Sequence, residues 1–251
     1  MKKAVVLTYN TTSKSAKYLT QQLEGRMITH MEEIRPDECM INWGGGYFPS
    51  RAWHREWLNK PSAICNAVDK LVAFHLFKEH GVQSPFWTSQ HEIVRRWLQE
   101  GSIVVARQTS TGMMGQGISL LTTPSTPIPS AKFFTKHVQH DKEYRVHIFK
   151  GMVINLGYKR QLRQEANLLI RNADEYNWDF YYTSTVPYPV IHEAIAAVQS
   201  LGLDFGAADV GYQTNSSQAW VFEVNTAPGI GHHTITKYAQ HITRYLRSLY
   251  D

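Results

Sequence analysis

The pattern of apolar and polar residues changes from strand-like to helix-like and back over the first 60 residues. Apolar and β-branched residues fill 4–8 and predict a strand, which a polar loop and a short helix at 15–23 follow. Short apolar runs at 26–30 and 39–42 indicate two further strands. Strands that alternate with helices in this way predict a small α/β layer at the N-terminus.

The rest of the chain is predicted to mix helices with β-hairpins. Residues 63–79 carry apolar positions at helical spacing and precede Gly81, which is typical of a helix end. Residues 143–149 and 152–158 indicate two strands joined by a turn at Lys150 and Gly151. The other predicted elements are helices at 92–99, 191–201 and 235–249 and strands at 102–107, 118–120 and 132–138.

Composition places the chain among ordinary globular proteins, with 251 residues of which 43% are hydrophobic. No apolar run approaches the roughly 18 residues needed to span a bilayer, so no contact with a membrane is expected. The two cysteines, Cys39 and Cys65, favour a reduced, cytoplasmic setting. The net charge of +5 fits an anionic substrate such as a nucleotide and permits contact with nucleic acid without establishing it. Composition does not indicate an oligomeric state.

The segment 221–229 (VFEVNTAPG) is the most informative motif in the chain. Alternate residues of a strand point to the same face, so Glu223 and Asn225 project side by side. An antiparallel pairing across the turn at 213–218 places Asp209 opposite Glu223. Carboxylate and amide oxygens on one rigid hairpin suit Mg²⁺. The alternative is that these are solvated polar residues at strand ends.

A Gly-rich loop occupies residues 107–117 (RQTSTGMMGQG) between two predicted strands. Its backbone N–H groups are suited to cradling phosphates, and Arg107 supplies a fixed positive charge. The spacing matches neither a Walker A motif nor a dinucleotide fingerprint, and an ordinary Gly-rich hairpin explains the loop equally well on its own. The metal hairpin downstream makes nucleotide binding the better explanation.

Basic residues gather on the predicted hairpin of the middle region. Alternation places Glu143, Arg145 and His147 on one strand face, and the next strand brings Lys159 and Arg160. One interpretation is a ladder of surface ion pairs between the strands. The other is a cationic cluster that neutralises a transferring phosphoryl group. His147 fits a packing role equally well, and no chemistry is assigned to it.

Trp43 is retained as a candidate substrate contact because it lies beside three consecutive glycines. A glycine run lets the backbone bend or approach a ligand closely. Tryptophans such as Trp43, Trp53 and Trp57 nevertheless lie in a core more often than in a site.

The order of these motifs resembles the ATP-grasp superfamily over about residues 60 to 240. Within it, the chain is similar to glutathione synthetase-like carboxylate–amine ligases, to the ribosomal-protein glutamate ligase type and to short phage-borne members. The resemblance is carried by Asp69-Lys70, Arg107 with its Gly loop, the segments 134–138 and 143–145, Lys159-Arg160, Asp209 and the segment 223–229. It implies an α/β (α+β) fold with two α+β lobes that grip ATP. The implied units are a small α/β domain at 1–62, a small lobe with a lid loop at 63–134 and a large lobe with the Mg²⁺ site at 135–251.

The resemblance also implies a role for individual residues. The implied metal ligands are Asp209, Glu223 and Asn225, which would hold two Mg²⁺ ions with Mn²⁺ as a substitute. The implied nucleotide contacts are Lys70, Arg107, the lid residues Thr109, Gly112, Gly115, Gln116 and Gly117, the linker residues Thr135, Lys136 and Val138, and Glu143. The implied catalytic residues are Arg145, Lys159 and Arg160, with Arg145 facing the γ-phosphate. Arg107 departs from the family, which usually has lysine there, and the first domain is shorter than usual.

The function that follows from the resemblance is an ATP-dependent ligase that joins a carboxylate to an amine through an acyl phosphate. Its partners would be small-molecule or peptide carboxylates and amines, which the sequence does not identify. A related alternative is an ATP-grasp kinase that phosphorylates a hydroxyl group. An alternative of another class is a module that binds a nucleotide or nucleic acid without turnover.

Overall fold

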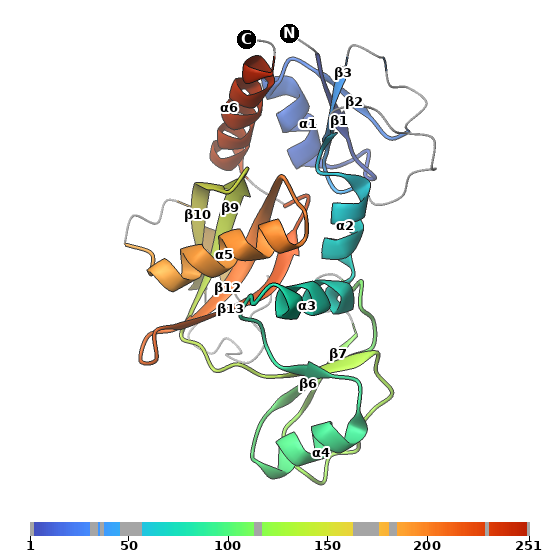
Figure 1. Ribbon diagram of the computed structural model, residues 1–251, viewed down its shortest axis with the longest axis vertical. Helices are drawn as coiled ribbons and strands as arrows, with labels where there is room; N and C mark the ends of the chain where they lie inside the picture. Colours follow the sequence, from blue (N-terminus) through green and yellow to red (C-terminus); the bar gives the residue numbers. More distant parts are fainter. Residues whose placement is uncertain are drawn as a thin grey trace.

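The computed structural model describes residues 3–30, 35, 38–45, 57–112, 117–162, 176–180, 185–228 and 231–249. The described strands form two four-stranded sheets and one five-stranded sheet, which follow one another along the long axis of the molecule (Figure 1). These sheets and the helices between them give the predicted mixed α/β class. Each sheet lies largely within one of the three predicted units, although the boundaries of those units stay a prediction.

The N-terminal sheet is parallel and has the order β2-β1-β3-β4. Its strands are β1 (Lys3–Leu7), β2 (Arg26–Ile28), β3 (Glu38–Asn42) and β4 (Trp57–Leu58). Helix α1 (Lys14–Gln22) begins after Ser13, whose hydroxyl accepts a hydrogen bond from the Ala16 N–H. The C-terminal helix α6 (His232–Ser248) lies beside α1 (Figure 1), and the rings of Tyr18 and His232 are 4.0 Å apart. The C-terminal helix α6 therefore contributes side chains to the hydrophobic core of the N-terminal unit.

Trp43 belongs to this core, so its retention as a substrate contact was wrong. The side chain is fully buried, stacks on Phe205 at 5.5 Å and meets the edge of Tyr238 at 5.3 Å. Its indole Nε1–H donates to the Ser15 hydroxyl. The neighbouring Gly44 instead serves a close approach of two chain segments, since a Cβ there would lie 2.7 Å from the Cβ of Ala227.

The central sheet is antiparallel and has the order β11-β10-β9-β12-β13. Its strands are β9 (Lys142–Phe149), β10 (Met152–Gln161), β11 (Tyr176–Asp179), β12 (Phe205–Gln213) and β13 (Gln218–Asn225). The predicted turn at Lys150 and Gly151 is confirmed, and both residues have positive φ angles. Helix α5 (Tyr188–Ser200) covers one face of this sheet (Figure 1).

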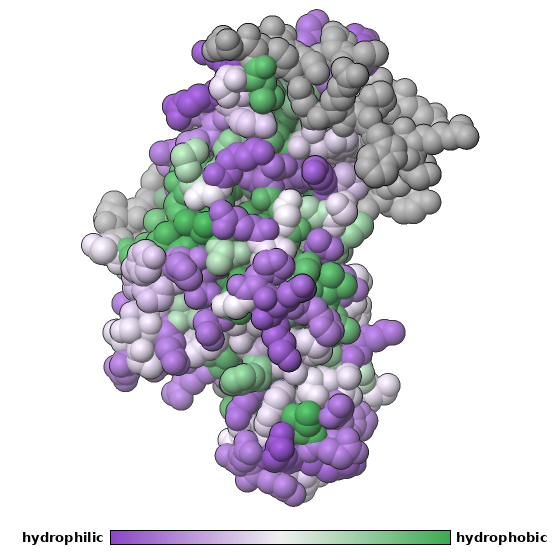
Figure 2. All heavy atoms as spheres, viewed as in Figure 1, coloured by the Kyte–Doolittle hydropathy of each residue, from purple (hydrophilic) through white to green (hydrophobic). Residues whose placement is uncertain are grey.

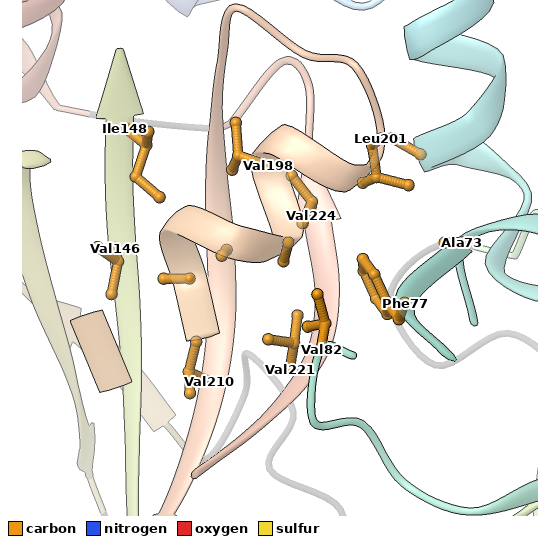
Figure 3. Packing of buried hydrophobic residues seen from close by; sticks show 14 of the residues in the cluster. Ala73, Phe77, Val82, Val146, Ile148, Val198, Leu201, Val210, Val221 and Val224 are labelled. Carbon is orange, nitrogen blue, oxygen red and sulfur yellow. The ribbon is translucent and has the colours of Figure 1, made fainter. Parts of the chain in front are cut away.

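The main core fills the space between α5 and the central sheet. Val146 and Ile148 of β9, Val210 of β12 and Val221 of β13 point toward α5, and Phe77 packs at the side (Figure 3). Because strand residues alternate, the polar residues between these apolar ones must emerge on the opposite face. The core thus determines which face of the sheet is available for a site.

The predicted single helix at 63–79 is two helices, α2 (Pro61–Val68) and α3 (Lys70–Glu79). Asp69 separates them with an extended backbone, and its carboxylate accepts hydrogen bonds from the Leu71 and Val72 N–H groups. The prediction failed because the apolar spacing continues across the break. Aspartate is nevertheless a strong helix-capping residue, so the signal was present in the sequence.

The third sheet has the order β5-β8-β6-β7, formed by β5 (Trp87–Thr88), β8 (Phe133–Lys136), β6 (Val104–Arg107) and β7 (Ile118–Leu121). Helix α4 (His91–Gln99) packs on the face that carries Phe134 and Ala106. Phe133 points the other way and meets Phe74 of α3. The face of this unit that Figure 2 shows is mostly hydrophilic. Among the described residues, no helix has the length and apolar character that crossing a membrane requires.

A buried asparagine fastens the N-terminal unit to the central sheet. The side-chain amide of Asn59 donates to the Phe205 carbonyl at 2.9 Å, and its oxygen accepts from the Asp204 and Phe205 N–H groups. Asn59 is fully buried and has a φ of 63°, a conformation that asparagine tolerates better than most residues. These bonds position the start of β12.

We expect Asn59→Ala to lower the free energy of unfolding by about 3–5 kcal/mol, because it removes hydrogen bonds to three backbone groups at the start of β12, two of them buried. Urea unfolding followed by circular dichroism measures the change. Asn66→Ala is the matched control, since Asn66 makes a single bond of 3.3 Å to the Leu201 carbonyl, and a loss of about 1 kcal/mol is expected. Asn59→Gly removes the strain of the positive φ, so full stability in that variant would contradict the hydrogen-bond explanation.

Candidate functional site

The site lies on the face of the central sheet opposite α5, where Arg145 and Asp209 are direct neighbours on β9 and β12. Arg145 donates from Nε and Nη2 to the two carboxylate oxygens of Asp209, both at 2.7 Å. The two side chains are almost entirely buried. Such a two-point bond fixes the guanidinium plane as well as its position.

A second pair, Lys159 with Glu143, lies on the same face. The Lys159 ammonium donates to Glu143 at 2.6 Å, and the His140 ring lies 3.8 Å from the other carboxylate oxygen. Burial works to raise the pKa of Glu143, but His140 and Lys159 outweigh it and lower that pKa. The predicted cluster of Glu143, Arg145 and Lys159 is therefore brought together. These side chains are buried, so the alternative interpretation as a ladder of surface ion pairs does not describe them.

Arg160 does not join this cluster. It pairs with Asn177 on β11, and alternation along β10 turns it to the face opposite Lys159. Its side chain is 66% exposed and lies 3.8 Å from Asp179. Of the three residues implied to be catalytic, the structure brings together Arg145 and Lys159 only.

The three candidate metal ligands also converge. Asp209 lies directly opposite Glu223 in the hairpin of β12 and β13, as the sequence predicted. The Asn225 Nδ2–H group donates to Asp209 at 3.5 Å and to Glu223 at 3.4 Å. Among the described residues, no cluster of three His, Cys, Asp or Glu side chains suited to a metal is present, so the set depends on Asn225 as its third member. Two carboxylates and one side-chain amide form a donor set that fits Mg²⁺, with the amide turned so that its oxygen takes the place of Nδ2.

The two carboxylates of this set differ in their affinity for protons. Burial raises the pKa of Asp209 to about 6, although Arg145 acts in the opposite direction. Burial also works to raise the pKa of Glu223, but Lys70, Arg145 and Asn225 together outweigh it and lower that pKa. A metal ligand must be deprotonated. As the pH falls, Asp209 would be the first of the two carboxylates to be protonated.

Lys70 connects the metal ligands to the Gly-rich loop. Its ammonium lies 3.2 Å from Glu223 and donates to the Gly112 carbonyl at 3.1 Å. Its backbone N–H donates to the Ser110 carbonyl, and the Ser110 hydroxyl donates to Asp69 at 3.0 Å. These roles of Ser110 and Asp69 were not predicted from the sequence, although the helix-capping signal of Asp69 was available.

The Gly-rich loop begins and ends as a hairpin between β6 and β7. The Gln108 N–H donates to the Gly117 carbonyl, and Gly117 has a φ of 66°, which favours glycine. Thr109 is on the loop and bonds to Thr111. The predicted contacts Gly115 and Gln116 lie outside the described residues.

Arg107 occupies the end of β6 on the same face as Phe133, whose ring centroid is 5.9 Å away. Burial lowers the pKa of this guanidinium, while the carboxylate of Glu223 acts to raise it. Within the described parts of the chain, its buried Nε has no hydrogen-bond partner. A buried donor without a partner is costly, so this position is suited to an anion.

The predicted linker borders a hollow of about 340 Å³ between the third sheet and the tip of the β12–β13 hairpin. Lys136 and Val138 line it, and Lys136 also lies 3.6 Å from Glu100. Thr135 is buried within β8 instead. Phe86 and Trp220 also line the hollow. Neither residue was predicted from the sequence, because the two come from segments that only folding brings together.

His147 lies on the site face but serves packing. It is fully buried, and its Nδ1 lies 3.1 Å from the Tyr238 hydroxyl, which donates to the Gly206 carbonyl. Burial lowers the pKa of His147 to about 3, with the charge of Arg145 acting in the same direction. The ring is therefore neutral at neutral pH and supplies no charge to the site.

Comparison with known proteins identifies the fold. No protein-family model matches the sequence, and no curated protein matches it. Among solved structures, the ATP-grasp ligase PsnB complexed with a minimal precursor has a TM-score of 0.68 at 12% identity, covering 97% of this chain and 99% of that chain. D-alanine–D-alanine ligase from Bacillus anthracis gives 0.64 at 11% identity, covering 99% and 98%. The macrocyclase MdnC bound with precursor peptide MdnA, from Microcystis aeruginosa, gives 0.61 at 11%, covering 94% and 98%. The chain has the fold of the ATP-grasp ligases.

Proposed function

We propose that the protein is an ATP-dependent ligase that joins a carboxylate to an amine. The observation that carries this proposal is the meeting of Asp209, Glu223 and Asn225 with Lys70 and Arg145 on one sheet face. Oxygen ligands next to fixed cations are what a transferring phosphoryl group requires. The likeness to ATP-grasp ligases over nearly the whole chain supports the same proposal.

Different residues of the chain would bind the metal and the phosphates. Asp209, Glu223 and Asn225 would hold Mg²⁺, in two ions or with Mn²⁺ as a substitute, and the metal would neutralise phosphate charge. A related ATP-grasp ligase structure contains Mg and ADP. Lys70 and Arg107 would bind phosphate oxygens, under a lid formed by the Gly-rich loop with Thr109, Gly112, Gly115, Gln116 and Gly117.

The reaction proposed has two displacements. A carboxylate oxygen of the substrate attacks the γ-phosphorus of ATP, the bond to the β,γ-bridging oxygen breaks, and ADP leaves. The amine nitrogen then attacks the acyl carbon, phosphate leaves, and the amine loses a proton as the amide forms. Arg145 and Lys159 would stabilise charge on the transferring phosphoryl group, while the closed lid would keep water from the acyl phosphate. Arg160 is exposed on the other face of the sheet, so a catalytic role has less support for Arg160 than for Arg145 and Lys159.

The base of the nucleotide would occupy the hollow beside the linker. Lys136, Val138 and the aromatic side chains of Phe86 and Trp220 line it, and aromatic faces suit a planar base. Thr135 would act by holding the linker strand, and Glu143 by orienting its cationic neighbours or contacting the ribose.

The substrates are proposed by class. The PsnB structure holds a minimal precursor and the MdnC structure holds the precursor peptide MdnA, which favours a peptide as one partner of this chain, with a small-molecule carboxylate or amine as the alternative. Contact with nucleic acid is supported only by the net charge of +5. A cytoplasmic setting rests on cysteine usage.

The test is release of ADP and phosphate from Mg-ATP by the full chain, with pools of carboxylates and amines supplied together and separately. A ligase requires both pools and yields an amide detectable by mass spectrometry. A stable phosphorylated product formed without an amine would identify a kinase instead. If calorimetry shows that the folded protein binds no ADP in the presence of Mg²⁺, the proposed function is wrong.

A further inference from the structure

Trp178 occupies an unassigned place at the edge of the proposed site. It belongs to β11, the edge strand of the central sheet, and lies directly opposite Lys159 in the register with β10. Residues opposite each other in an antiparallel pair project to the same face. Trp178 therefore shares the face of Lys159 and Arg145, and it is half-buried there.

The indole of Trp178 contacts both cations of the site. The guanidinium carbon of Arg145 lies 4.4 Å from the ring centroid, and the ammonium of Lys159 lies 5.1 Å from it. Both distances are within the range in which the negative face of an aromatic ring attracts a cation, and tryptophan gives the strongest attraction. The indole ring of Trp178 thus attracts both cations and favours their lying close together in spite of their like charge.

The guanidinium of Arg145 is constrained from two directions. The carboxylate of Asp209 accepts hydrogen bonds from Nε and Nη2, and the guanidinium lies over the face of the Trp178 indole ring. Within the described parts of the chain, Nη1 donates no hydrogen bond. This arrangement presents the remaining N–H groups of Arg145 in a fixed direction.

We propose that Trp178 is a positioning residue, which holds Arg145 and Lys159 for the terminal phosphate of the nucleotide. The proposal rests on the proposed function, because it assumes that this phosphate binds beside Arg145. A positioned donor loses less conformational freedom on binding an anion than a mobile one. The effect should therefore fall on ligands that carry the γ-phosphate and should leave ADP binding almost unchanged.

Trp178→Leu and Trp178→Met keep apolar bulk but remove the aromatic face, whereas Trp178→Phe keeps a face. Calorimetric titration with ADP and with the ATP analogue AMP-PNP, each with Mg²⁺, measures the two affinities. We expect Trp178→Leu and Trp178→Met to weaken AMP-PNP binding about tenfold and ADP binding less than about twofold, and Trp178→Phe to retain most of the affinity. Trp57→Leu is the matched control, because Trp57 is half-buried on β4, an edge strand of the N-terminal sheet, and should change neither affinity.

A double-mutant cycle tests whether Trp178 acts through Arg145. In the Arg145→Met background, Trp178→Leu should weaken AMP-PNP binding by a smaller factor than in the wild type, because Lys159 is then the one cation left of the two that Trp178 contacts. Equal weakening of ADP and AMP-PNP, no weakening of either, or an undiminished effect in the Arg145→Met background would overturn the proposal. Failure of the wild type to bind either nucleotide would overturn the proposed function together with it. Normal wild-type binding with unaffected Trp178 variants would overturn only the role of Trp178.

Discussion

Asp209→Asn and Glu223→Gln are each expected to reduce ADP formation by about 1,000-fold or more. Both substitutions replace a charged metal ligand with a neutral amide, and a bound metal contributes several kcal/mol to stabilising a phosphoryl transition state. Coupled detection of ADP measures the rate, and calorimetry with Mg²⁺ and ADP measures the accompanying loss of nucleotide binding. Retained turnover in both variants would contradict the metal assignment.

The control for Asp209→Asn must account for the buried ion pair that it breaks. Breaking such a pair costs about 3–5 kcal/mol of stability, so a loss of activity alone is ambiguous. Glu38 supplies a matched case, since it accepts from Arg26 Nε and Nη2 at 2.7 Å, the same geometry as Asp209 with Arg145. Glu38→Gln should lower stability while leaving the rate of ADP formation unchanged in protein that circular dichroism shows to be folded.

Arg145→Met is expected to slow phosphoryl transfer by about 100- to 1,000-fold while weakening ADP binding far less. The guanidinium would act on charge that develops in the transition state, and removing one such donor typically has an effect of this size. Single-turnover kinetics measures the transfer step, and calorimetry measures the affinity for ADP. A change in nucleotide affinity without a change in the transfer rate would mean that the transition-state role is wrong.

Two further substitutions separate the chemistry of Arg145 from its structural effect. Arg26→Met removes the equivalent arginine of the N-terminal pair and should not alter the transfer step. Arg145→Lys keeps the charge but cannot reproduce the parallel two-point bond of the guanidinium to Asp209, so an intermediate rate is expected. Equal slowing by Arg26→Met and Arg145→Met would assign the effect to stability.

Much of the site was predictable because its residues are close in sequence or follow a simple period. Glu223 and Asn225 share a face through strand alternation, and a short turn brings Asp209 opposite them. The pairing of β9 with β10 was equally local, and it placed Lys159 beside Glu143. In each case the geometry follows from a hairpin, which leaves few ways to arrange the residues.

The predictions from sequence were wrong where one pattern of residues is compatible with two different local structures. An apolar spacing of helical period continues through Asp69, yet a single capping carboxylate divides the helix there. A tryptophan beside a run of glycines suits a binding site as well as a core, and Trp43 lies in the core. Arg160 follows Lys159 directly, and adjacent strand residues point to opposite faces.

By itself, the sequence determined the α/β class, the acidic hairpin and the basic strand, because local periodicity and turn chemistry are sufficient for these. Only the tertiary structure decided that Trp178 lies over Arg145, that Asn59 secures the start of β12, and that Phe86 and Trp220 border the same hollow. Those contacts join segments far apart in the chain. The order of strands in a sheet and the packing of its core place such segments together, and no short pattern of residues records that arrangement.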